Sequence, residues 1–177
     1  MLKFWRENKY AAIIVAVVRI ILGYQWIKGG WGKVTGGGFD ATGFMTNAIN
    51  NPVAKGDEVL YPLYNGFIEN VALPMVDVIN VIVPWGELLV GIGLITGILT
   101  IPAVFFGLLM NFMFMFAGTV STNPLLVLLG FIVMLAAGNA GRFGGDYFVA
   151  PWLKKNIGAK LTKRDKTKTD AAELKTA

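Results

Sequence analysis

Two charged residues, Arg19 and Glu87, interrupt the apolar stretches of this sequence and are the first candidates for chemistry. Residues 78–141 contain one charged side chain, Glu87, and Arg19 divides the apolar segment 10–27. A charge at the centre of a bilayer costs about 2.5–3.5 kcal/mol on insertion scales, so each charge needs a physical reason. The helical rise of about 1.5 Å per residue places each one about 14 Å into its apolar segment. We therefore predict that they meet near the midplane, either as a structural ion pair or as a catalytic site in which Glu87 exchanges protons and Arg19 holds an anion.

Asn111 and Arg142 are further binding candidates. Asn111 shares a helical stripe with Gly107 and Gly118, where it serves either as an interhelical hydrogen-bonding group or as a ligand contact. Arg142 stands four residues before Asp146, so the two form either a cytoplasmic-edge pair or a simple topology signal.

Three residues near the end of the first apolar segment complete the set of binding candidates. Lys28 and Lys33 are expected to gather an anion above Arg19. Trp26 is either a binding residue or an anchor at the membrane interface, where tryptophan is common.

The elements that must position these residues are predicted to be four membrane-spanning helices. The 177 residues are 55% hydrophobic and have a mean hydropathy of +0.59, more apolar mass than a soluble core of this size needs. About 20 apolar residues in a helix cross a hydrocarbon core of about 30 Å. A proline inside the second segment leaves its start open by about six residues. We predict an all-α, integral membrane four-helix bundle, with spans at 10–27, 78–101, 103–118 and 125–141.

Residues 28–77 separate the first two spans and are predicted to form a structured extracytoplasmic cap. Glycines and prolines interrupt the segment, but its aromatic side chains are too many for a solvated linker. Short helices are expected near Asp40 and Asn65. Residues 1–155 then make up the membrane domain, and residues 156–177 a basic cytoplasmic tail.

The distribution of charge predicts a multi-pass protein of the cell membrane with both termini in the cytoplasm. The N-terminal segment has three basic residues and one acidic residue, and the chain from Arg142 onward has nine and four. Residues 28–77 are net acidic, which fits the positive-inside rule. Residues 146–155 are expected to lie at the interface. Since the net charge of +5 is segregated in this way, we predict the lipid bilayer, and not nucleic acid, as the partner.

Cysteine and histidine are both absent. Their absence removes a disulfide framework, a redox thiol, a haem held by histidine and any ordinary zinc site, and we predict no metal site. If electrons move through this protein, the carrier is organic or belongs to a partner. The run FMFMF at 112–116 suits a flat apolar ligand such as a quinone, or it faces lipid.

Four segments together resemble the DoxX/DoxD family of membrane proteins, over about residues 10–150. They are RIILGYQWIKGGWGK at 19–33, PWGELLVGIGLITGILT at 84–100, LLMNFMFMFAGT at 108–119 and AGNAGRFGGDYF at 137–148. The resemblance implies a four-helix protein related to the membrane subunit of thiosulfate:quinone oxidoreductase, in which thiosulfate is oxidised to tetrathionate and electrons pass to quinone. It implies that Arg19, Glu87, Asn111 and Arg142 are the polar positions of those motifs.

The leading interpretation is therefore a quinone-linked oxidoreductase or its membrane subunit, with quinone as a substrate or bound cofactor. An anionic sulfur substrate would approach Lys28, Lys33 and Arg19, and Glu87 would handle the protons of the quinol. Because no internal redox relay is evident, a second redox subunit is one expectation, and a homo-oligomer remains open. The alternatives are a non-catalytic membrane scaffold for redox or stress-response enzymes, or a small anion transporter, although no internal repeat is detectable.

Overall fold

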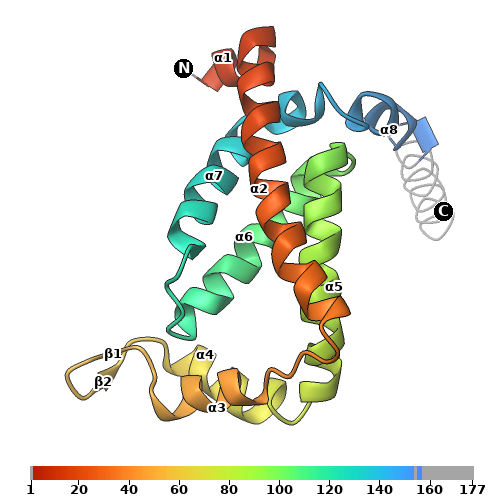
Figure 1. Cartoon of the computed structure of the whole chain (residues 1–177). Coiled ribbons are helices and arrows are strands. Elements are labelled where there is room, and N and C mark those ends of the chain that lie inside the picture. The colour runs from red at the N-terminus through yellow and green to blue at the C-terminus, as the bar shows by residue number, and fades with distance from the viewer. Residues whose placement is uncertain (1, 154, 157–177) are drawn as a thin grey trace, which may run out of the picture.

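The structure is a computed structural model that describes residues 2–153, 155 and 156, and these are mostly helical (Figure 1). The basic tail expected at 156–177 lies outside the described residues, apart from Asn156. The elements are α1 (Leu2–Glu7), α2 (Lys9–Thr35), α3 (Thr42–Asn50), β1 (Ala54–Lys55), β2 (Glu58–Val59), α4 (Pro62–Phe67), the π-helix η1 (Ile68–Ala72), α5 (Val76–Thr96), α6 (Thr100–Phe116), α7 (Asn123–Leu135), the 3₁₀-helix η2 (Ala137–Gly141) and α8 (Asp146–Leu153).

Four helices, α2, α5, α6 and α7, pack together into the body of the molecule. The longest contact runs along α2 and α5, while α6 packs between α5 and α7. Leu22, Leu94, Val104 and Val133 are at most 1% exposed and lie at the centre of the core that the four helices share. Each of the four helices contributes one of these residues, so the core depends on all of them.

Glycines allow the backbones of α2 and α5 to approach closely. A Cβ at Gly91 would lie 2.7 Å from the backbone nitrogen of Ile27, and one at Gly23 would lie 2.9 Å from the carbonyl oxygen of Gly91. A Cβ at Gly30 would lie 2.7 Å from the backbone nitrogen of Leu88. Small residues are required wherever two helix backbones meet this closely.

Two of the helices, α2 and α5, are long and apolar enough to cross a membrane, with 27 and 21 residues. Their large apolar side chains also face outward: Ile13, Val17 and Ile21 of α2 and Val81 and Leu89 of α5 are each at least 50% exposed. An extended exposed apolar surface is typical of a protein that contacts lipid or a partner. These two helices indicate association with a membrane.

The first helix is longer than predicted. It continues to Thr35 instead of ending at residue 27, so residues 28–35 belong to α2 and not to the cap. Glycine lowers helix propensity, but Gly30 packs directly on α5, and this contact keeps the segment helical. The second helix begins at Val76, so Pro84 lies inside it.

The later boundaries also differ from the prediction. Helix α5 ends at Thr96, where Gly97 takes a left-handed φ of 67°, and α6 begins at Thr100. The segment predicted as a fourth span, 125–141, is divided into α7 and η2, with Ala137 at a φ of 49° between them. Hydropathy alone does not register these backbone changes.

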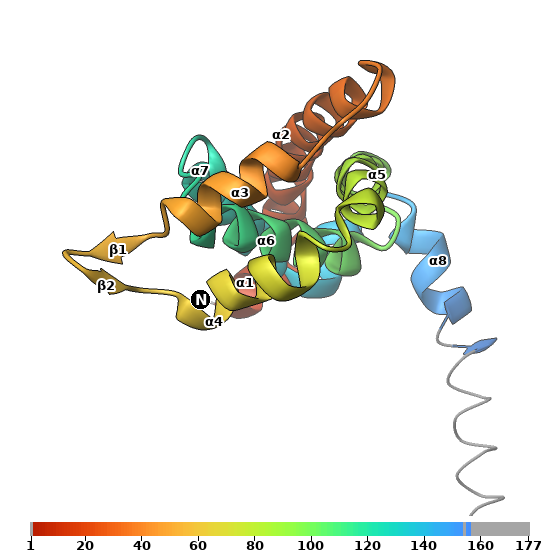
Figure 2. The same cartoon turned by 90° about the horizontal axis from the view of Figure 1, so that it is seen from below.

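The cap consists of α3, the small β1–β2 hairpin, α4 and η1, and it covers one end of the helices (Figures 1 and 2). Asp40 lies just before α3, near its start as expected, and accepts hydrogen bonds from the backbone N–H and the hydroxyl of Thr42, at 2.9 and 2.6 Å; the N-cap position itself is Ala41. Asn65 lies within α4, which begins instead at Pro62. The antiparallel β1–β2 hairpin, with Lys55 paired to Glu58, was not predicted.

Helices α1 and α8 lie at the end opposite the cap (Figure 1). Tyr147, Phe148 and Trp152 of α8 are 66%, 75% and 63% exposed. Helix α8 projects sideways from the other helices, which suits the predicted interfacial segment.

Candidate functional site

Glu87 is buried at the cap end of the α2–α5 contact, where it pairs with Lys33. Only 3% of Glu87 is exposed, and its Oε1 accepts a hydrogen bond from Nζ of Lys33 at 2.5 Å. Gly29 of α2 makes room for the carboxylate, because a Cβ there would lie 3.3 Å from Oε2. The Lys33 side chain is 30% exposed, so the pair lies at the edge of the buried core.

An apolar cavity lies beside this ion pair, between the cap and the helices. Nζ of Lys33 is 5.0 Å from the ring centroid of Phe39 and 5.7 Å from that of Phe114, within the range of cation–π attraction. Both rings also line a cavity of about 110 Å³. Its other lining residues are Ala41, Phe44, Met45, Tyr64, Phe67, Ile68, Ala72, Ile79, Val83, Met110 and Met113.

Part of the FMFMF run faces the protein interior. Met113 and Phe114 line the cavity, and Phe116 contacts the rings of Tyr61 and Tyr64 at centroid distances of 4.6 and 5.7 Å. The run therefore forms the wall between α6 and the cap, and the ligand-lining interpretation applies to Met113 and Phe114.

Two buried acceptor atoms on α5 and α6 have no hydrogen-bond partner among the described residues. They are Oε2 of Glu87 and Oδ1 of Asn111, which is 1% exposed. Gly86 of α5 packs against Met110 of α6, and Met110 lines the cavity. Glu87 is the residue after Gly86, and Asn111 is the residue after Met110. A buried acceptor without a donor costs about 1–3 kcal/mol. Such atoms suit a ligand hydroxyl or an ordered water.

These residues suit a flat apolar ligand in chemistry, but the cavity is smaller than a quinone ring requires unless its walls move. An apolar cavity of about 150 Å³ is known to hold benzene, and the cavity here is about 110 Å³. Met110 and Met113 are flexible side chains that adapt to the shape of a ligand. Phe39 and Phe114 supply flat surfaces for a ring, whereas Glu87 and Asn111 lie behind the residues that line the cavity.

Tyr64 attaches the cap to α6 at the edge of the cavity. Its hydroxyl donates a hydrogen bond to the carbonyl oxygen of Met113 at 2.8 Å, and burial raises the pKa of Tyr64 to about 12. In the same cap, the hydroxyl and the N–H of Thr42 hold the pKa of Asp40 below its usual range. At neutral pH Tyr64 is therefore protonated and able to donate.

Arg19 does not meet Glu87, so the predicted midplane pair is wrong. Arg19 is 1% exposed, and it donates from Nη1 to the carbonyl oxygen of Leu94 at 2.8 Å and from Nη2 to that of Phe143 at 3.1 Å. Because α2 and α5 are antiparallel, Lys33 reaches Glu87 while Arg19 lies about 21 Å away along α2. The prediction counted depth from residue 78 and ended the first helix before Lys33.

The Arg19 contacts belong to a polar turn between α5 and α6. Asp146 accepts hydrogen bonds from the N–H groups of Leu99 and Thr100 at 2.7 and 2.9 Å, and its own N–H donates to the carbonyl oxygen of Gly97 at 2.7 Å. Arg19 thus stabilises the carboxyl end of α5, and Asp146 the amino end of α6. Arg19 serves the fold at this turn.

The proposed partner of Arg142 is also different from the prediction. Its Nη1 donates to the carbonyl oxygen of Glu7 at 3.1 Å, and both carboxylate oxygens of Asp146 are bonded elsewhere. The expected Arg142–Asp146 edge pair is not formed among the described residues.

The predicted anion site of Lys28, Lys33 and Arg19 is not assembled. Lys28 is exposed, and it lies five residues from Lys33, about 140° around the helix. Trp26 is neither beside them nor at an interface: it is 5% exposed and packs against α6, where a Cβ at Gly107 would lie 3.2 Å from its Nε1.

The roles of several residues in the candidate site and in the turn between α5 and α6 were not predicted from the sequence. Tyr64 and Phe39 were noted only as aromatic cap residues, and their position in the chain carries no sign that they face Met113 and Lys33. Asp146 had a recognisable signal, because an acidic residue in a glycine-rich loop is a common helix cap. Its target, the start of α6 at Thr100, lies 46 residues away.

Comparisons with protein-family models, with curated proteins and with solved structures find no match for this chain.

Proposed function

We propose that the chain is a quinone-linked membrane oxidoreductase, or the membrane subunit of one, of the DoxX/DoxD type that its sequence resembles. The observation that carries the proposal is the buried Lys33–Glu87 pair beside an aromatic and methionine-lined cavity, with unpartnered acceptors on Glu87 and Asn111.

In this proposal the chain crosses the cell membrane four times, through α2, α5, α6 and α7. Helix α6 has 17 residues, or about 25 Å. Helix α7 has 13 residues, or about 20 Å, and the five residues of η2 extend it by about 10 Å. Both termini are cytoplasmic and the cap is outside, as the positive-inside rule requires.

Each residue of the site has a proposed role. The quinone ring would lie between Phe39 and Phe114, and Asn111 would accept a hydrogen bond from a quinol hydroxyl. A quinone takes up two protons with two electrons, and Glu87 would deliver or remove a proton at Oε2 while Lys33 holds Oε1 in place.

The electron donor, thiosulfate in this proposal, needs a binding site of its own. Thiosulfate oxidation joins two thiosulfate ions as tetrathionate and releases two electrons, and a site for these anions requires several cations. Lys28, Lys33 and Arg19 do not converge, so we assign the donor site to a second redox subunit that docks on the cap.

The test is reduction of a soluble quinone analogue, with thiosulfate and other sulfur donors, by the purified full chain, both alone and with membrane extract from the source cell to supply the second subunit. Glu87→Gln keeps the shape of the side chain and is expected to lower the rate by about 100-fold or more, as for loss of a general acid–base group. Lys28→Gln, on the same helix but exposed, is the control and should retain the wild-type rate.

An inactive wild type that becomes active when membrane extract from the source cell is added supports the two-subunit form. Full activity of Glu87→Gln would contradict the role of Glu87. If none of the quinone analogues binds the wild type, the quinone proposal itself is contradicted.

A non-catalytic scaffold is the second candidate, and the surface of the cap favours it. Leu63 is 92% exposed and Leu60 is 46% exposed, and the β1–β2 hairpin projects from the cap (Figure 2). Isolation of a stoichiometric soluble enzyme on the cap, with assembly unchanged by Glu87→Gln, would support the scaffold. A transporter is not favoured, because the apolar core of Leu22 and Leu94 separates Arg19 from Glu87.

A further inference from the structure

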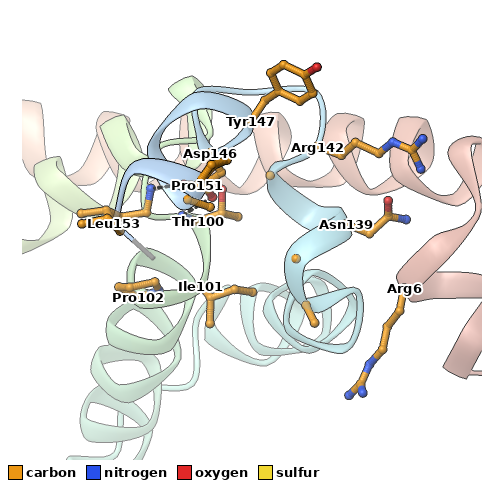
Figure 3. A pocket seen from close by; sticks show the side chains of 15 residues that line it. Arg6, Thr100, Ile101, Pro102, Asn139, Arg142, Asp146, Tyr147, Pro151 and Leu153 are labelled. Atoms are coloured by element: carbon orange, nitrogen blue, oxygen red, sulfur yellow. Dashed lines mark hydrogen bonds between the residues drawn. The ribbon is translucent and has the colours of Figure 1, made fainter. Parts of the chain in front are cut away.

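A large groove lies at the end of the molecule opposite the cap, far from the Lys33–Glu87 site. It has a volume of about 570 Å³ and lies between α1, η2, the start of α6 and α8 (Figure 3). Its walls are mostly apolar, including Leu99, Ile101, Pro102, Pro151 and Leu153. The volume is about five times that of the cavity under the cap.

Two arginines lie on one side of this groove. Figure 3 shows Arg6 and Arg142 on either side of Asn139, away from Pro151 and Leu153. Nε of Arg6 donates to the carbonyl oxygen of Leu135 at 3.4 Å, and Nη1 of Arg142 donates to that of Glu7 at 3.1 Å. A guanidinium has five N–H donors, so most donors of both groups remain available.

The acidic groups near these arginines leave the groove open to an anion. Asp146 lines the groove, but both its oxygens accept backbone hydrogen bonds from Leu99 and Thr100. Glu7 is exposed and does not line the groove. Asn139 donates to the carbonyl oxygens of Trp5 and Asn8 at 2.8 and 3.0 Å, so it fixes α1 against η2 and keeps Arg6 beside the groove.

We propose that this groove binds an anionic phospholipid, with an acyl chain along the apolar wall and with Arg6 and Arg142 at the rim attracting the charged headgroup. Guanidinium groups bind phosphate through paired, charge-assisted hydrogen bonds. Basic pockets between helices on the cytoplasmic side of a membrane suit anionic lipid headgroups. The exposed rings of Tyr147, Phe148 and Trp152 on α8 place the groove at headgroup level.

This inference rests on the proposed membrane placement and not on the quinone chemistry. The experiment reads lipid retention alone, so its failure leaves the quinone assay as an independent test. Conversely, an inactive protein that retains the lipid would contradict only the oxidoreductase proposal.

The experiment is native mass spectrometry of the full chain, released from mixed micelles that contain equal amounts of phosphatidylglycerol and phosphatidylcholine. Wild type should retain phosphatidylglycerol preferentially. The double variant Arg6→Gln, Arg142→Gln should lose this adduct by about tenfold or more. The control, Lys3→Gln with Lys9→Gln, removes the same charge from the same end but from residues outside the groove, and should stay within about twofold of wild type.

A second variant fills the groove and leaves its charge unchanged. Gly138 lines the groove, and a Cβ there would meet no atom within 4 Å. Gly138→Leu should therefore displace the lipid in a protein whose thermal unfolding is unchanged, which separates lipid loss from misfolding. Circular dichroism of each variant confirms that the helices are intact.

Three outcomes would overturn the proposal. One is equal retention of the two lipids by wild type, and another is an equal loss of phosphatidylglycerol from the lysine control, which would show attraction by net charge alone. The third is displacement of the adduct by free inorganic phosphate, which would identify an anion site without a lipid.

Discussion

Two positions on α5, its carboxyl end and its middle, each lie at a buried charge from the predicted functional pair, and the hydrogen bonds of the two charges differ. At the end near α8, Arg19 donates to the carbonyl oxygens of Leu94 and Phe143, so its partners are backbone groups. In the middle of α5, Oε1 of Glu87 accepts a hydrogen bond from Lys33, and Oε2 has no donor among the described residues. Each charge thus leaves one buried atom without a partner among the described residues, Nε of Arg19 and Oε2 of Glu87, but only Glu87 has an ion-pair partner, Lys33, that lies against rings lining a cavity.

This difference shows how a buried charge is assigned to stability or to chemistry. A charge whose hydrogen bonds go to backbone carbonyl oxygens, at a helix end and in a loop, is explained by the fold, because those carbonyls otherwise lack donors. An acceptor that remains unpartnered next to a cavity is not explained by the fold and calls for a ligand. The predictions that follow test this assignment at Arg19 and at Glu87.

Arg19→Gln is expected to have the largest effect on stability. It removes two charge-assisted hydrogen bonds and leaves the carbonyl oxygens of Leu94 and Phe143 unpaired. We expect the free energy of unfolding in mixed micelles to fall by about 4 kcal/mol. A stable Arg19→Gln protein that has lost only its activity would instead show that Arg19 is catalytic.

Lys33→Met should be less damaging, and unlike Arg19→Gln it should be reversible by a second substitution. Alone it leaves Glu87 buried without a cation and should cost about 3 kcal/mol of unfolding free energy. Combined with Glu87→Leu it should recover most of that loss, since an apolar pair often replaces a buried ion pair.

The same double variant should be inactive in quinone reduction, because it lacks the proton-exchanging carboxylate. Failure of the double variant to recover stability would show that the Lys33–Glu87 pair is required by the fold, as Arg19 is. Equilibrium unfolding of the two single variants and the double variant measures this coupling directly.

Gly97→Ala should destabilise the Arg19 end by about 2 kcal/mol. Gly97 has a φ of 67°, and a Cβ there would collide with Nη1 of Arg19. The control is Gly86→Ala in the middle of α5, beside Glu87, where a Cβ would lie at an ordinary 3.6 Å from Sδ of Met110. That change should be neutral or stabilise by about 0.5–1 kcal/mol, since alanine favours the helix. Equal effects of the two would contradict the close packing at Gly97.

The smallest effect is expected at alkaline pH in the cap. Burial raises the pKa of Tyr64 from 10.0 to about 12, so below pH 10 the folded and unfolded states are both protonated and stability is unaffected. Between pH 10 and about 12 the unfolded state ionises first, and the cap should lose stability as the pH rises. Ultraviolet absorbance of tyrosinate should show a group titrating near pH 12 that Tyr64→Phe removes. An identical titration of both proteins would contradict the burial of Tyr64 against Met113.

Much of the local structure was predictable from residue types. Hydropathy predicted the central parts of α2, α5, α6 and α7, and a short helix was expected near Asp40, where α3 begins. The ends of the helices were not, because Gly30 stays helical only by packing on α5 and the turn at Gly97 is held by Arg19 and the loop before α8. For the candidate site, Glu87, Lys33 and Asn111 were proposed from the sequence, but the predicted ion-pair partner of Glu87 was wrong.

The sequence by itself determined the apolar helical character of the chain, the scarcity of charge between residues 78 and 141, and the absence of cysteine and histidine. These depend on side-chain chemistry and on periodicity along one segment. The tertiary structure decided that Lys33 reaches Glu87, that Arg19 stabilises the end of α5, and that Phe39 and Tyr64 close a cavity over α6. Such contacts join residues 49–75 positions apart, and they follow from the relative shift and rotation of packed helices, which hydropathy does not specify.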